Sequence, residues 1–64
     1  MGNWIKNAVD SALRIIPRHR PVDVPAMRRI IALLAREDDV ELADGEIDRA
    51  IISACLAERR PLRW

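Results

Sequence analysis

Cysteine, histidine and aromatic residues are scarce in this chain, and their scarcity excludes several classes of protein. Cys55 is the only cysteine and His19 the only histidine among 64 residues. A disulfide framework therefore cannot form within one chain, and a structural zinc site, which normally needs four Cys or His ligands, lacks its donors. Two tryptophans are the only aromatic residues, so a core has to be built from aliphatic side chains. We expect neither a metal ion nor a cofactor.

Catalytic motifs are also missing. The only histidine lies between two arginines, without a neighbouring carboxylate or nucleophile with which it could form a catalytic pair. Cys55 falls on an apolar helix face, where a cysteine usually behaves as a small hydrophobic residue. In the acidic stretch before Gly45, an EF-hand register would place Val40 and Ile51 at calcium-ligand positions, which excludes such a loop. We expect that the protein is not an enzyme.

Long hydrophobic runs are absent, which bears on where the protein is found. Residues 1–6 lack the basic start and the apolar run of a signal peptide. No stretch approaches the length of about 20 apolar residues that spans a bilayer. A single cysteine also fits a reducing compartment. The sequence favours a cytoplasmic protein.

Helical periodicity is what the sequence has in abundance. Over residues 4–16, apolar side chains fill one half of a helical projection and polar ones the other half. Residues 25–37 predict a central helix, with Pro25 suited to its first turn and an apolar band wider than half the circumference. We expect that this helix packs on both sides and shows water only its arginine stripe. A third helix is predicted over 44–60, capped by Asp44 and stopped by Pro61.

These elements predict an all-α fold in a single domain. The helices at 25–37 and 44–60 are expected to form an antiparallel hairpin, which the amphipathic helix at 4–16 covers. A proline-rich linker at 17–24 and a short C-terminal tail at 61–64 complete the chain. Pro17 ends the first helix because the residue before a proline is pushed out of helical geometry.

Charge is segregated along the chain, although the formal net charge is only +1. Every charged residue between Glu37 and Asp48 is acidic, whereas bases dominate on both sides of this block. Blocks of opposite sign can pair within one fold or steer association between molecules. This pattern is not that of a uniformly basic nucleic-acid binder.

The length of the chain points to association. So short a chain buries a modest fraction of its surface and needs a supplement, and disulfides and zinc are excluded here. Ile52 and Leu56 lie away from the alanine-rich face of the third helix. The C-terminal tail could cover them by folding back through Leu62 and Trp64, but we expect another chain to do so, because Pro61 leads the tail away. We therefore expect a non-enzymatic protein–protein interaction module, an adaptor, regulator or inhibitor, that self-associates. The expected apolar anchors are Ile52, Leu56, Leu62 and Trp64, inside a polar rim of Arg49, Arg59, Arg60 and Arg63.

Three alternatives stay open. Trp4 and Trp64 can instead belong to the core of the monomer. Nucleic acid can be bound through phosphate contacts, although the acidic start of the third helix argues against a helix-turn-helix reader; the phosphate contacts would come from Arg14, Arg18, Arg20, Arg28 and Arg29. Peripheral membrane association through the helix at 4–16 is the third alternative.

Overall fold

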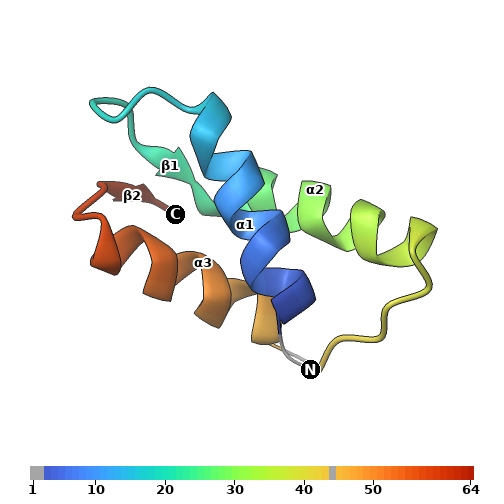
Figure 1. Cartoon of the computed structure of the whole chain (residues 1–64). Helices are drawn as coiled ribbons and strands as arrows, with labels where there is room; N and C mark the ends of the chain where they lie inside the picture. Colours follow the sequence, from blue (N-terminus) through green and yellow to red (C-terminus); the bar gives the residue numbers. More distant parts are fainter. Residues whose placement is uncertain (1–2, 44) are drawn as a thin grey trace.

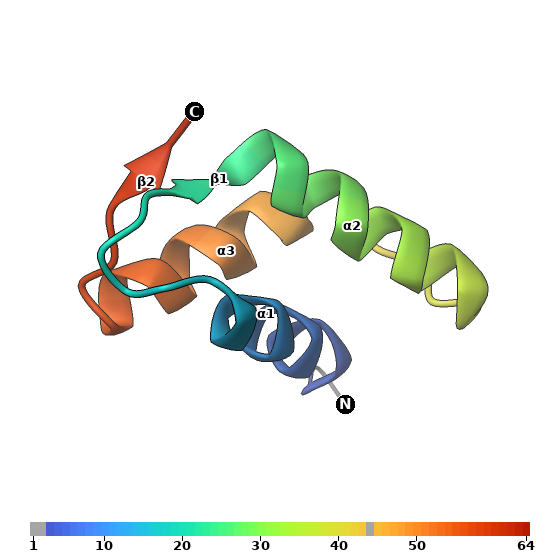
Figure 2. The same ribbon diagram turned by 90° about the horizontal axis from the view of Figure 1, so that it is seen from above.

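The computed structural model describes residues 3–43 and 45–64, which form three helices and one two-stranded bridge (Figure 1). The helices are α1 (Asn3–Ile15), α2 (Val24–Glu37) and α3 (Glu46–Ala57), and the strands are β1 (Val22–Asp23) and β2 (Leu62–Arg63). α2 and α3 run antiparallel and α1 packs across them (Figures 1 and 2), which confirms the predicted three-helix fold.

One aliphatic core joins the three helices. Each helix contributes the side chains that its apolar periodicity places on one face, as an amphipathic helix requires. The buried members of this core cluster are Ile5, Val9, Leu13, Val22, Val24, Met27, Ile31, Ile51 and Cys55. Ile31, Ile51 and Cys55 are completely inaccessible to solvent, and Val9 and Leu13 of α1 are 1% exposed, so all three helices share the centre of the core.

The start of α2 is fixed by Asp23. Its backbone is extended, with φ −77° and ψ 101°, and its Oδ1 accepts a hydrogen bond of 3.1 Å from the backbone N–H of Ala26. This is the usual geometry of a carboxylate N-cap. α2 therefore begins at Val24, one residue before the predicted start, and Pro25 lies in its first turn as expected.

α2 and α3 end in the same way, in a Schellman motif whose left-handed residue is not glycine. In α2 this residue is Asp39 (φ 55°), and in α3 it is Arg59 (φ 54°). In α3 the backbone N–H of Arg60 then donates to the carbonyl of Cys55 over 2.8 Å, which satisfies a carbonyl that has no helical donor. The predicted end of this helix at residue 60 was wrong, because the chain reverses at Arg59 before it reaches Pro61.

The start of α3 also differs from the prediction. α3 begins at Glu46, and its N-cap position is Gly45, with a φ of 77° that glycine adopts without strain. The Glu46 side chain accepts a hydrogen bond of 2.9 Å from the backbone N–H of Ala43 and so ties the preceding loop to the helix. The predicted N-cap, Asp44, lies outside the described residues.

The C-terminal tail does not lead away from the helices, and this part of the prediction was wrong. β2 pairs with β1 in parallel, with Val22 opposite Leu62, and the N–H of Val22 donates to the carbonyl of Pro61 over 2.8 Å. The left-handed turn at Arg59 directs the chain back toward the linker, where Leu62 packs against the core. The bridge is short, and the fold stays mostly helical.

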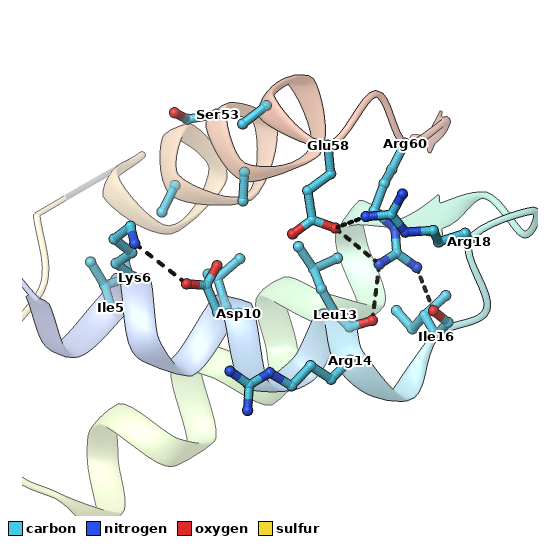
Figure 3. A pocket seen from close by; sticks show the side chains of 14 residues that line it. Ile5, Lys6, Asp10, Leu13, Arg14, Ile16, Arg18, Ser53, Glu58 and Arg60 are labelled. Carbon is cyan, nitrogen blue, oxygen red and sulfur yellow. Dashed lines mark hydrogen bonds and ion pairs between the residues drawn. The ribbon is translucent and has the colours of Figure 1, made fainter.

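Arg60 fastens the C-terminal end of α1. Its side chain is 4% exposed, and the guanidinium group donates to the carbonyl of Leu13 over 3.1 Å and also to the carbonyl of Ile16 (Figure 3). Carbonyls at the end of a helix lack intrahelical donors and attract a cation. The prediction that Arg60 belongs to the rim of a binding surface was therefore wrong, because its side chain is used inside the fold.

Candidate protein-binding groove between α1 and α2

An apolar groove of about 550 Å³ runs between α1 and α2. The two helices are antiparallel, because the N-terminal Trp4 of α1 lies beside Asp38 at the C-terminal end of α2. Small and aliphatic side chains line both sides: Ala8, Ala12 and Ile15 on α1, and Ala26, Ile30 and Leu34 on α2. Alanines on both helices leave room for another backbone to come close.

The aliphatic walls of this groove are open to solvent. Ile15 is 84% exposed, Ile30 is 52% exposed and Leu34 is 40% exposed. Leu33, next to them on the outer surface of α2, is 59% exposed. A single exposed leucine is ordinary, but a contiguous apolar patch commonly marks a surface where another molecule binds.

The two ends of the groove are acidic. The indole N–H of Trp4 donates to Oδ2 of Asp38 over 3.0 Å and ties the helices together at one end. Asp23, the N-cap of α2, lies at the other end. These two carboxylates are the only charged groups among the described residues that line the groove, so its electrostatic character is negative.

The expected burial of the whole apolar band of α2 was wrong. α2 was expected to show water only its arginines, yet Ile30, Leu33 and Leu34 are exposed. The buried residues of this helix are Val24, Met27, Ile31 and Ala35. The sequence did indicate an excess of apolar surface on α2, because its apolar band is wider than packing against one helix requires.

Of the four predicted apolar anchors on α3 and the tail, two are exposed and two are half-buried. Leu56 is 69% exposed and Trp64 is 70% exposed, so both are available to a partner. Ile52 is half-buried, and Leu62 is half-buried against the core. Of the predicted rim, the exposed members are Arg49, Arg59 and Arg63.

The alternative that placed both tryptophans in the monomer core holds for one of them. Trp4 is half-buried and packs against the core cluster, while its indole N–H bonds to Asp38. Trp64 is largely exposed at the C-terminal end of β2. An indole ring with one buried edge and one hydrogen-bonded edge is the usual arrangement for this side chain.

The arginines suggested for phosphate contacts differ in what they contact. Arg28 of α2 forms a bidentate pair with Asp48 of α3, with Nε and Nη2 at 2.6 and 2.9 Å from the carboxylate oxygens. The hydrogen bond to Asp48 and its negative charge raise the pKa of Arg28. Arg18 lies 3.9 Å from Glu58. The other three, Arg14, Arg20 and Arg29, are exposed.

A second hollow, of about 730 Å³, lies between α1 and α3 (Figure 3). Part of its charged rim pairs within the chain: Lys6 lies 3.6 Å from Asp10, and Glu58 contacts both Arg18 and Arg60. Arg14 also lines the hollow and is exposed. Ala50, Ser53 and Ala54 form its α3 side. Among the described residues, four basic and two acidic side chains line this hollow, so its lining carries a net positive charge, whereas the groove between α1 and α2 is mainly apolar with two carboxylates.

Cys55 is buried completely, and burial raises the pKa of its thiol. The thiol therefore stays protonated near neutral pH, which suits a packing role and not that of a nucleophile. Across residues 3–43 and 45–64, no three His, Cys, Asp or Glu side chains gather where they could hold a metal ion. Within the same ranges, no helix has the length and apolar character needed to cross a membrane.

Comparisons with protein-family models, with curated proteins and with solved structures find no match to this chain.

Proposed function

We propose that this chain is a small, non-enzymatic protein–protein interaction module that binds one amphipathic helix of a partner protein in the groove between α1 and α2. The observation that carries the proposal is the solvent exposure of Ile15, Ile30 and Leu34 along a concave, alanine-lined surface. An amphipathic helix that lays its apolar side chains into such a groove is a recurring mode of recognition between proteins.

The dimensions of the groove favour a helix over a small molecule. α2 has 14 residues, so at about 1.5 Å per residue it offers a wall of about 21 Å, or four turns of a partner helix. Packed helices come within about 8–10 Å of each other, which the alanines of both walls permit. A small ligand is normally buried over most of its surface, whereas Ile15 stands almost fully in solvent.

Self-association through exposed side chains of α3 and the C-terminal tail is the second candidate. Leu56 and Trp64 are exposed, and Arg59 and Arg63 are exposed beside them in sequence. Residues 37–41, at the start of the acidic block, carry exposed carboxylates, whose charge is opposite to that of these arginines. A head-to-tail contact between copies would join these two regions, and such a contact forms rings or filaments.

Matched double substitutions separate the two candidates. Ile15→Glu with Ile30→Glu places charge in the groove, and Leu56→Glu with Trp64→Glu places the same charge on the other surface. All four side chains are more than half exposed, so each variant should keep the helical circular dichroism of the parent chain. We expect the groove variant to lose capture of partner proteins from the native host by at least about tenfold, as for hot-spot residues.

The tail variant serves as the control in that capture experiment and as the test of self-association. It should retain the partner, and light scattering should show whether it lowers the molecular mass in solution. If capture survives in the groove variant and disappears in the tail variant, the groove is not the binding surface and the second candidate takes its place.

A further inference from the structure

Building on the proposed helix-binding role, we infer that the partner helix carries a lysine or arginine at each end, placed to meet Asp23 and Asp38. Both carboxylates line the groove, and none of its described lining residues is basic. A partner with bases at these two points would neutralise the charges of Asp23 and Asp38, whereas an acidic partner would be repelled.

The spacing of the two bases follows from the geometry of α2. Asp23 precedes the helix and Asp38 follows it, so 14 helical residues separate them. At about 1.5 Å per residue this corresponds to roughly 22 Å, or four helical turns. On a partner helix that lies along α2, two side chains about 14 or 15 positions apart span this distance on one face.

Both carboxylates are already held in position. Asp23 Oδ1 accepts from the backbone of Ala26, and Asp38 Oδ2 accepts from the indole of Trp4. An ionised carboxylate has about four acceptor sites, so each can take a further hydrogen bond from a base. Because these side chains are partly ordered before binding, less conformational entropy is lost when the partner arrives.

The same charges argue against a symmetric dimer that joins two copies of this chain through their grooves. Two such grooves packed face to face would bring carboxylates together without a base in either lining, and like charges in an interface weaken it. An anionic lipid surface or a nucleic-acid backbone would be repelled for the same reason.

Three synthetic helical peptides test the inference directly. They share one leucine face and differ only at two positions 14 residues apart, which carry Lys, Gln or Glu. Each is titrated into the isotopically labelled full chain and followed by NMR. We expect shifts at Ile15, Ile30 and Leu34 with all three, and an affinity that falls by about threefold per lost ion pair from Lys to Gln, within the range of exposed pairs. Added salt should reduce this preference.

Asp23→Asn combined with Asp38→Asn provides the matched control. Asparagine still caps a helix, and its amide oxygen still accepts the indole N–H, so the fold is kept while both charges are removed. The three peptides should bind this variant equally. Equal binding of the Lys and Glu peptides to the groove of the parent chain would overturn the inference and leave the helix-binding role intact. Shifts confined to Leu56 and Trp64, no shifts at all, or dimers formed through the groove would overturn the role itself.

Discussion

At the scale of single residues, Arg59 holds a backbone conformation that a side chain with a Cβ adopts at a cost. Its φ of 54° ends α3, and the same geometry recurs at Asp39 after α2. Glycine adopts the left-handed region freely, whereas other residues lose about 1 kcal/mol or more there. The turn is kept because it returns the chain to β1, where Leu62 covers the core.

Arg59→Gly should therefore stabilise the protein. We expect relief of this strain to raise the free energy of unfolding by about 1 kcal/mol. The higher conformational entropy that glycine gives the unfolded chain reduces this gain. Urea denaturation followed by circular dichroism measures the change. Arg63→Gly, in the extended strand β2, is the control and should bring no gain; a loss of stability in Arg59→Gly would contradict the argument.

Cys55 gives the protein a dependence on pH. Burial raises the pKa of this thiol in the folded state, so the unfolded chain loses its proton first as pH rises. The contribution to stability is complete below the ordinary thiol pKa of about 8.5 and is lost above it. The difference in unfolding free energy between the parent chain and Cys55→Ala should therefore shrink from pH 7 to pH 9.5. A constant difference would show that the thiol titrates normally.

At the scale of elements, the C-terminal segment matters more than its length suggests. Arg60 reaches back to Leu13 and Ile16, which lie 47 and 44 positions away in sequence. The same segment supplies β2, which pairs with β1 at the start of α2. One stretch of chain thus fixes the end of α1 and the beginning of α2 relative to α3.

Arg60→Met tests this fastening. Methionine keeps the unbranched apolar stem and removes the guanidinium group, so the carbonyl of Ile16 loses the donor from Arg60 and that of Leu13 keeps only the backbone N–H of Ile16. Hydrogen bonds from a charged donor contribute about 1.5–3 kcal/mol each, but burying a cation offsets part of this, and we expect a net loss of about 2 kcal/mol in unfolding free energy.

Hydrogen exchange should locate that loss in the last turn of α1. The exposed Arg63→Met is the control and should leave both stability and exchange unchanged. If Arg60→Met exchanges as slowly as the parent chain throughout α1, Arg60 does not hold the helix end.

Sequence periodicity predicted the helices well and their ends less well. The stops and starts set by Pro17 and Pro25 were correct to one residue, because proline acts through its own covalent geometry. The two-residue strands could not be predicted, since they carry no alternating pattern of their own. The end of α3 depended on a turn at Arg59, a residue without left-handed preference.

At the scale of the whole molecule, the chain is compact but its core is small. Its radius of gyration is 11.0 Å, close to the value of about 10.7 Å expected for this length. Half of the residues are hydrophobic, yet the fully buried set is short, and large aliphatic side chains remain on the surface. The expected excess of apolar surface is present, and its main concentration is the groove between α1 and α2, not the α3 face chosen from the sequence.

The charge blocks also acquire a role only in the folded chain. The acidic block supplies Asp48, which pairs with Arg28 and joins α3 to α2, and Asp38, which marks one end of the groove. Asp23, far from that block in sequence, marks the other end. Segregation along the sequence therefore did not indicate which charges would share a surface.

The amino-acid sequence by itself determined the number of helices, their faces and their approximate lengths, because these depend on local periodicity and on the fixed geometry of proline. Only the tertiary structure decided which part of each wide apolar band is covered, that Arg60 is buried and that the tail returns to the linker. Those outcomes depend on contacts between residues distant in sequence, where packing of one helix against another selects a few side chains and leaves the rest for solvent or for a partner.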